Sequence, residues 1–364
     1  MLPVFPIIID FHTFTMHSQL ASHNLSLIKI YSNTLTLNKL IENCARKTMQ
    51  STCTLCKSRN ASYSRPYSGE KLCTRCFCKS IETKVRGTIA KHEMLRFDDQ
   101  IAMGLSGGKD SMTLLSMLSK LEKSFPKTKL VAITIDEGIQ EYRDEALKIS
   151  EKACRKLGIE QIIVSFEELF GYNLDEMVQK LHNKTDRKSG FTPCAYCGVL
   201  RRRALNTAAR DWGATKLATA HNLDDEIQTM LINIMHGDPL RIVRGNPVTS
   251  SKNTHFVRRI KPLSEILEKE TTFYAFQKKI QFQDIPCPHS TIALRNDVRA
   301  MLNRMEENHP GLKYTVYRSV EKLEALAENM PHREQNTLCR VCNEPAANDI
   351  CQPCKMMQSF ERAK

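Results

Sequence analysis

The stretch Ile101-Ala-Met-Gly-Leu-Ser-Gly-Gly-Lys-Asp-Ser111 decides the fold. The apolar residues of a short strand run into a Gly-Gly turn, and the apolar residues that follow recur at helical spacing. Glycines let the backbone approach an oxyanion, and the first N–H groups of a helix are anion donors. The stretch therefore predicts a strand, a phosphate-binding loop and a helix in that order.

The spacing of the glycines distinguishes this loop from the commoner Walker A motif. A Walker A loop has four residues between its glycines and then Lys and Ser or Thr. Here three residues separate Gly104 from Gly108, and Asp110 follows Lys109. The loop resembles that of the ATP pyrophosphatases, which cleave ATP between its α and β phosphates and adenylate a carbonyl oxygen. The alternative is an ordinary glycine-rich turn without a ligand.

Strands and helices alternate through the central region. An amphipathic helix is expected over 142–157, closed by Gly158, and a helical pattern runs from Thr271 to Met330. Alternation with apolar strands predicts an α/β fold, a doubly wound parallel sheet covered on both faces, with ligands beyond the carboxyl ends of its strands. The expected strands are Gln100–Leu105, Leu130–Ile135, Gln161–Phe166 and Leu217–Ala220.

Composition indicates a nucleic-acid partner and a reducing compartment. The 364 residues carry a formal net charge of +13, and no apolar run is long enough to span a membrane. Eight of the fourteen cysteines form four Cys-x-x-Cys pairs that flank the central region. Such spacing is typical of metal binding, so we expect a cytoplasmic protein without a membrane segment.

Each flank carries the spacing of a four-cysteine zinc site. In each site, two Cys-x-x-Cys knuckles supply the four ligands of a tetrahedral zinc ion, and this number leaves no ligand position open. Both sites are therefore predicted to be structural. The first comprises Cys53, Cys56, Cys73 and Cys76, and the second comprises Cys339, Cys342, Cys351 and Cys354.

The same patterns predict four segments. Residues 49–95 form an N-terminal zinc module, residues 96–330 the catalytic domain, and residues 331–364 a C-terminal zinc module. Residues 1–48 contain no metal pair, glycine loop or clear amphipathic period, and Met49 stands just ahead of the first cysteine pair. We interpret residues 1–48 as a dispensable extension.

A fifth pair, Cys194-x-x-Cys197, has no second pair nearby and is followed by Gly198 and an arginine run. Cys287 lies between two prolines in a loop, where a rigid backbone can hold a thiolate at a distant site. Spacing alone leaves open whether Cys287 joins the pair. Cys154 falls on the apolar stripe of a helix and is expected to be a buried core residue.

The segment Leu217–Glu226 is a strand that breaks into a helix with three acidic residues in its first turn. Acidic residues there are favoured by the helix dipole, so capping explains part of the pattern. Asp225 has a second interpretation, in which it projects into the site and assists proton transfer or Mg²⁺ binding.

Together, the loop, Cys194-x-x-Cys197-Gly and His221-Asn-Leu-Asp-Asp-Glu226 resemble the tRNA 2-thiouridine synthetase family, the TtuA-like group that includes the cytoplasmic tRNA 2-thiolation proteins. The resemblance covers about residues 50–360. It implies an enzyme, a tRNA-uridine 2-sulfurtransferase that converts ATP to AMP and pyrophosphate. It also implies that Cys194, Cys197 and Cys287 hold a [4Fe–4S] cluster.

The resemblance also assigns roles to single residues. Arg201 stands where some members have Lys, and Ala220 where Gly is usual, so these two contacts are less certain than the loop. The candidate catalytic residues are Cys194, Cys197, Cys287 and Arg201, which the resemblance implies, and Asp225, which its position suggests. The implied ATP-binding residues, which would act with Mg²⁺, are Gly104, Leu105, Ser106, Gly107, Gly108, Lys109, Asp110, Ser111, Asp136, Arg201 and Ala220.

Three thiolates leave one iron of a four-iron cluster without a protein ligand, and an exogenous sulfide fits there. The alternative is a persulfide on Cys194 or Cys287. The resemblance suggests tRNA, a ubiquitin-like thiocarboxylate carrier or free sulfide, and a second copy of the chain as partners. The sequence does not determine whether the wobble or the T-loop uridine is modified.

Two other functions compete with sulfur transfer. One is a pyrophosphate-loop ligase or amidotransferase that adenylates a carbonyl and delivers nitrogen, which requires no cysteine triad. The other is a non-catalytic zinc-ribbon RNA-binding protein with a vestigial nucleotide fold. The intact Lys109-Asp-Ser111 argues against the second.

Overall fold

The computed structural model describes residues 51–182, 192–237, 255–290, 294–327, 337–346 and 348–361. The predicted extension, residues 1–48, lies outside this part of the chain. Among the helices described, none has the length and apolar character needed to cross a bilayer.

The core of the molecule is a five-stranded parallel sheet in the order β5-β4-β3-β6-β7. The order reverses between β3 and β6, so the chain winds outward in both directions from this point, as predicted for a doubly wound fold. Loops at such a switch point diverge and leave room for a ligand. The strands are β3 (Gln100–Gly104), β4 (Lys129–Asp136), β5 (Glu160–Ser165), β6 (Lys216–Ala218) and β7 (Arg258–Ile260).

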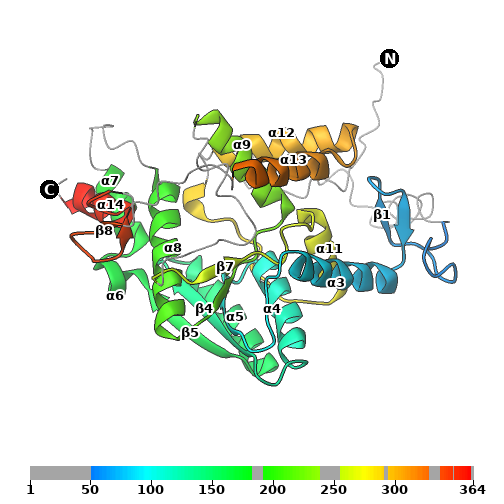
Figure 1. Ribbon diagram of the computed structural model, residues 1–364, viewed down its shortest axis with the longest axis horizontal. Helices are drawn as coiled ribbons and strands as arrows, with labels where there is room; N and C mark the ends of the chain where they lie inside the picture. Colours follow the sequence, from blue (N-terminus) through cyan, green and yellow to red (C-terminus); the bar gives the residue numbers. More distant parts are fainter. Residues whose placement is uncertain are drawn as a thin grey trace, which may run out of the picture.

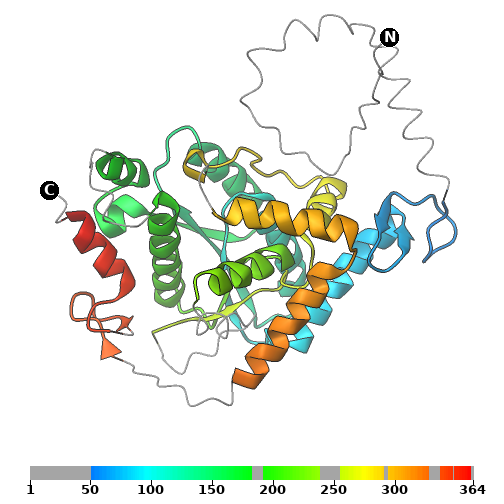
Figure 2. The same cartoon turned by 90° about the horizontal axis from the view of Figure 1, so that it is seen from above.

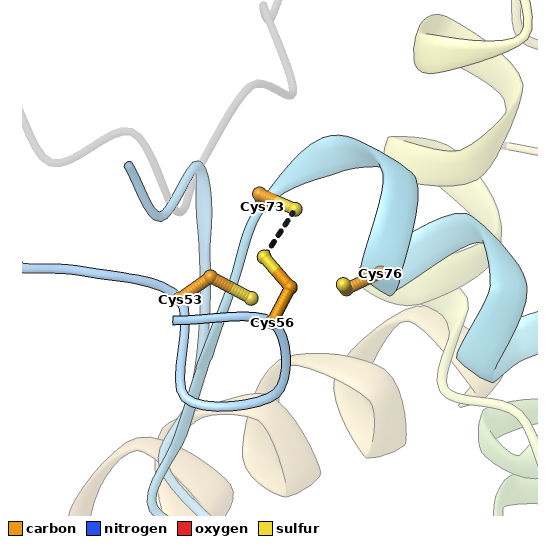
Figure 3. A group of neighbouring side chains, drawn as sticks. All are labelled: Cys53, Cys56, Cys73 and Cys76. Atoms are coloured by element: carbon orange, nitrogen blue, oxygen red, sulfur yellow. Dashed lines mark hydrogen bonds between the residues drawn. The ribbon is translucent and has the colours of Figure 1, made fainter. Parts of the chain in front are cut away.

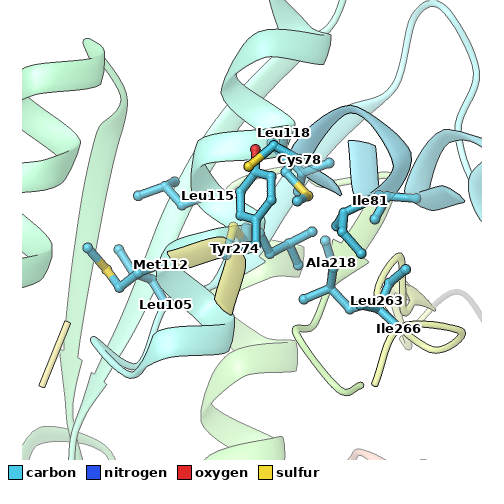
Figure 4. Close-up of a cluster of buried hydrophobic side chains, with 14 of the residues drawn as sticks. Cys78, Ile81, Leu105, Met112, Leu115, Leu118, Ala218, Leu263, Ile266 and Tyr274 are labelled. Atoms are coloured by element: carbon cyan, nitrogen blue, oxygen red, sulfur yellow. The ribbon is translucent and has the colours of Figure 1, made fainter. Parts of the chain in front are cut away.

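Helices cover both faces of the sheet because side chains alternate along its strands. Ile101 and Met103 of β3 belong to the apolar cluster with α4 (Lys109–Glu122), whereas Ala102 between them belongs to the cluster with α8 (Pro193–Asp211). Figure 4 shows the first cluster, in which Tyr274 from late in the chain lies close to Leu118 of α4, and Leu263 lies close to Ala218 and Ile266.

The predicted elements agree closely with the structure. The helix expected over 142–157 is α5 (Arg143–Leu157), and Gly158 ends it at φ 72°, the left-handed conformation in which glycine is favoured. Cys154 on this helix is 2% exposed and packs in the core, as predicted. On the α8 side lie α6 (Phe166–Phe170) and α7 (Leu174–His182), whereas the buried residues of α9 (Leu223–Met235) belong to a separate third cluster.

The helical pattern expected over 271–330 is interrupted. The chain forms α11 (Glu268–Gln277), then an extended segment, the short 3-10 helix η3 (Pro288–Ser290), α12 (Leu294–Asn308) and α13 (Leu312–Ala327). The expectation is wrong for residues 278–287. Pro286 and Pro288 lack the backbone N–H that a helix needs, so the segment around Cys287 runs as a loop.

At the N-terminal end, β1 (Tyr63–Arg65) and β2 (Glu70–Leu72) form a hairpin that leads into α3 (Thr74–Lys91). Phe77, Ile81 and Val85 of α3 are buried in the same cluster as α4, so this region shares the main core. Figure 2 shows α3 running beside α13, where Lys84 Nζ donates to Tyr314 Oη at 2.6 Å.

The C-terminal region contains β8 (Thr337–Leu338), β9 (Pro345–Ala346) and α14 (Gln352–Glu361). Met356 and Phe360 of α14 pack in the cluster of α8. The two cysteine-rich regions lie at opposite ends of the molecule, as Figures 1 and 2 both show. The segment boundaries predicted from the sequence stay predictions.

Candidate functional site

The glycine loop follows β3 at the switch point of the sheet. Gly107 has φ 84°, and a Cβ placed on it would lie 2.9 Å from Ala146 on α5, so a larger residue would clash as well as be strained. Gly108 is the N-cap of α4 and offers no side chain to its amides. The amides that open α4 are therefore left for a ligand such as phosphate.

Lys109 lies among three carboxylates from three helix starts. Its Nζ lies 2.7 Å from Glu268 Oε1 and 3.1 Å from Asp110 Oδ2. Burial raises the pKa of Asp110 to about 6, and the charges of Asp225 and Glu268 add to the rise. Within the described residues, Asp110 Oδ1 is buried without a hydrogen-bond partner. Carboxylate oxygens in this arrangement are ligands that suit a divalent cation such as Mg²⁺.

Asp225 caps the helix on which it stands. Its backbone N–H donates to Asn222 Oδ1, and its Oδ2 accepts from the Asn222 N–H, both at 3.1 Å. The capping interpretation is therefore confirmed. Burial also raises the pKa of Asp225, and Glu268 adds to the rise, so its carboxylate belongs to the electrostatic group around Lys109. Its part in proton transfer or Mg²⁺ binding stays a prediction.

The structure brings Cys194, Cys197 and Cys287 together although more than eighty residues separate the pair from the third. The pair lies in the first turn of α8, and Cys194 Sγ is 3.4 Å from the carbonyl oxygen of His289 in η3. Burial raises the pKa of the Cys287 thiol, and the neighbouring Cys194 adds to the rise. Burial raises the pKa of Cys197 to about 11, against the lowering effect of Arg201. Such thiols lose their protons when a metal binds them.

A chain of charged contacts joins the glycine loop to these cysteines. Arg143 Nη1 donates to the Ser106 carbonyl at 2.9 Å, and its Nε lies 3.1 Å from Glu137 Oε2. On the other side, Glu137 Oε1 lies 2.7 Å from Arg201 Nε, and Arg201 Nη2 donates to Cys197 Sγ at 3.2 Å. Arg201 therefore lies between the phosphate loop and the cysteines, and its guanidinium group is ion-paired with the buried carboxylate of Glu137.

A second connection runs through the backbone. The N–H of Gln283 donates to the Gly107 carbonyl at 2.9 Å, and Gly108 pairs with Gln283 as an isolated parallel bridge. The same extended segment continues to Cys287. One piece of chain therefore contacts the glycine loop and supplies the third cysteine.

Comparisons with known proteins agree with this geometry. The model of the PP-loop domain family matches residues 79–306. The chain is 35% identical to the tRNA 2-thiolation protein NcsA of Haloferax volcanii over 83% of this chain and 97% of that one. It is 31% identical to cytoplasmic tRNA 2-thiolation protein 1 of Schizosaccharomyces pombe over 85% of this chain and 91% of that one.

Among solved structures, the U34-tRNA thiolase NcsA from Methanococcus maripaludis with its [4Fe-4S] cluster superposes with a TM-score of 0.72 and 32% identity, covering 85% of this chain and 96% of that one. The chain belongs to the PP-loop tRNA 2-thiolation family. The fold of this thiolation family and the resemblance noted in the sequence are thereby confirmed.

Sequence reasoning missed three residues of this thiolation-family site, namely Glu137, Arg143 and Glu268. Glu137 has a signal in the sequence, since β4 ends at Asp136 and Glu137-Gly138 follows at the carboxyl edge of the sheet, yet only Asp136 is selected from the sequence. Asp136 accepts the N–H of Gly138 at 2.9 Å and shapes this turn. Ala220, two residues after the end of β6, is partly buried against the core. The nucleotide contacts assigned to Asp136 and Ala220 stay predictions.

Both flanking sets of cysteines converge as their spacing predicts. Within each set, the sulfur atoms lie within 4.8 Å of one another. Figure 3 shows the first set, with Cys53 and Cys56 on one loop and Cys73 and Cys76 at the start of α3. Hydrogen bonds from Ser58 lower the pKa of Cys56 to about 6, which favours the thiolate that a metal requires. Four converging sulfurs suit tetrahedral Zn²⁺, whose identity here stays a prediction.

Proposed function

We propose that the protein is an ATP-dependent tRNA sulfurtransferase that converts a uridine to 2-thiouridine. The observation that carries the proposal is the contact chain from Ser106 in the glycine loop, through Arg143, Glu137 and Arg201, to Cys197. It holds an ATP-binding loop and a cysteine site side by side, as a reaction needs when it activates a carbonyl at one and delivers sulfur from the other.

The first step is adenylation. The uridine O2 attacks the α-phosphorus of ATP, the bond to the β-phosphate oxygen breaks, and pyrophosphate leaves. Lys109, Arg201 and the amides that open α4 supply positive charge to the phosphates, and Glu268 and Asp110 hold Lys109 until ATP arrives. The orphaned Oδ1 of Asp110 fits an accompanying Mg²⁺.

In the second step, sulfur bonds to C2 and AMP leaves with the former uridine oxygen. Cys194, Cys197 and Cys287 would hold a [4Fe–4S] cluster, and with three protein ligands such a cluster offers one open iron to sulfide. Arg201 donates to Cys197 Sγ and thereby favours its thiolate. The three cysteines match the three thiolate ligands that such a cluster requires, whereas a ligase that delivers nitrogen requires no such cysteines.

The basic net charge of +13 suits the phosphate backbone of tRNA. The same proposal includes a zinc ion at each four-cysteine site and a cytoplasmic location. It also includes a thiocarboxylate carrier or free sulfide as the sulfur donor, and a homodimer. The family resemblance and the names of the relatives support tRNA as the partner and the cytoplasm as the location.

The test is mass spectrometry of nucleosides from unmodified tRNA incubated anaerobically with protein, ATP, Mg²⁺ and sulfide. We expect 2-thiouridine, with AMP and pyrophosphate in equal amounts, and iron bound to the native chain. The variant Cys197→Ser should lose iron and product, and Cys154→Ser, a buried cysteine outside the site, should keep both. Release of pyrophosphate with a nucleoside in which nitrogen, not sulfur, has replaced the activated carbonyl oxygen would overturn the proposal.

A further inference from the structure

The C-terminal four-cysteine module is attached to the helix that carries the cysteine pair. Two points of α8 are held, one in its first turn and one farther along. In Figure 1, α14 and β8 lie beside α8, at the end of the molecule remote from α3.

The first point is Tyr196, which lies between Cys194 and Cys197 and is completely buried. Its hydroxyl lies 3.2 Å from Ser359 Oγ on α14. Ser359 gives its only proton to the Met356 carbonyl at 2.8 Å, so Tyr196 is the donor to Ser359. The ring also packs in one cluster with Met356 and Phe360. The turn that presents the cysteine pair therefore rests on α14.

The second point is Glu344, a residue of the C-terminal knuckle that is 6% exposed. Its carboxylate lies 3.0 Å from Arg203 Nη1 and 2.7 Å from Arg210 Nη1. These arginines are seven residues apart, which places them two turns apart on one face of α8. One carboxylate thus holds two turns of the helix.

Both points depend on the metal knuckle. The Glu344 carbonyl accepts the Cys339 N–H at 2.8 Å, and the Cys351 N–H donates to Cys339 Sγ at 3.3 Å. Cys354 lies in the first turn of α14. A metal on the four sulfurs therefore orders the loop that bears Glu344 and the start of the helix that bears Ser359.

We propose that the C-terminal module acts as a clamp on α8, and that Glu344 and Tyr196 are positioning residues for the cluster cysteines. This inference rests on the proposed function, in which Cys194 and Cys197 hold a cluster. It assigns to the C-terminal metal site a role in cluster retention as well as in local stability. The N-terminal module contacts α11 and α13 and is not part of the clamp.

The test compares Glu344→Gln, Tyr196→Phe and Cys342→Ser with the native full-length chain. Glu265→Gln and Cys53→Ser are matched controls, because they remove an ion-paired carboxylate and a metal ligand on the N-terminal side. Hydrogen exchange of α8 amides is measured on protein free of iron. Iron content and the electron paramagnetic resonance spectrum of the reduced cluster are measured after anaerobic reconstitution.

Relative to the amides of β4, we expect α8 amides to exchange about tenfold faster in Glu344→Gln and Cys342→Ser, with a smaller relative change in Tyr196→Phe and none in the controls. Bound iron should fall at least twofold in the same order, while ATP affinity stays within twofold of the native value. Unchanged exchange and iron in Glu344→Gln, or an equal loss in Glu265→Gln, would overturn the clamp.

The exchange measurement separates this inference from the proposed function. If the native chain binds no iron, the cluster assignment of the proposed function fails, and with it the link between the clamp and cluster retention, whatever α8 does. If the native chain binds iron and α8 exchange does not respond to Glu344, the clamp alone fails. Should Cys342→Ser not fold, Glu344→Gln decides the result, because it leaves all four sulfurs in place.

Discussion

Replacing Glu137 by Gln removes the single carboxylate shared by Arg143 and Arg201. Glu137 is 2% exposed, and its oxygens lie 2.7 and 3.1 Å from the two guanidinium groups. Breaking a buried ion pair by removing one partner costs about 3–5 kcal/mol, since it leaves an uncompensated buried charge. The Arg143 side chain is 5% exposed, so its charge would be left buried without a partner. The Arg201 side chain is 42% exposed, so water compensates part of its charge. We therefore expect a loss of about 2–4 kcal/mol in the free energy of unfolding.

The same change should slow pyrophosphate release, because Arg201, which the proposed function places at the ATP phosphates, loses the carboxylate that fixes its side chain. Glu137→Asp keeps the charge at shorter reach and should recover part of both losses. Glu167→Gln, an exposed glutamate on α6, is the matched control and should change stability by less than about 0.5 kcal/mol. Urea unfolding and a pyrophosphate assay with tRNA measure the two effects. A Glu137→Gln protein as stable and as fast as the native chain would refute the argument that this carboxylate organises the site.

Three further predictions concern other parts of the molecule. Lys109→Ala should reduce pyrophosphate release at least a hundredfold and leave tRNA binding within about twofold in a filter-binding assay, since one lysine among 53 basic residues adds little to the total charge. Cys287→Ser should lose the iron–sulfur absorbance and the thiolation activity, while ATP binding persists. Cys154→Ser should lose only about 1 kcal/mol of the free energy of unfolding and keep the iron–sulfur absorbance. Hydrogen bonds from His92 lower the pKa of Glu265 from 4.5 in the unfolded chain to about 2 in the folded protein. The ionised Glu265 therefore stabilises the fold at pH above 4.5, and this contribution is lost as the pH falls from about 4.5 to 2. Glu265→Gln should be about 1–3 kcal/mol less stable than the native chain at pH 7, and the difference in urea unfolding should vanish near pH 2; a constant difference would contradict the linkage.

The elements that the sequence determined are those whose cause is local. The strand–loop–helix of residues 100–122, the helix ended by Gly158 and the four Cys-x-x-Cys pairs each depend on residues within a few turns of one another. Side-chain period, glycine conformation and thiolate spacing act over that range, so a single sequence displays them. The sequence does not predict the short strand β7, because its three residues include two arginines and show no apolar run.

Only the tertiary structure decided which distant residues meet. Glu268 reaches Lys109 across 159 positions, and Glu344 reaches Arg210 across 134. The residues alone leave open whether Cys287 joins Cys194, and the family resemblance implies that it does. In the structure, Cys194 Sγ lies 3.4 Å from the carbonyl oxygen of His289, two residues after Cys287. Such pairings follow from the order of strands in the sheet and from the closure of long loops. No local pattern encodes them, because each partner in isolation is an ordinary charged residue or cysteine in its own helix or loop.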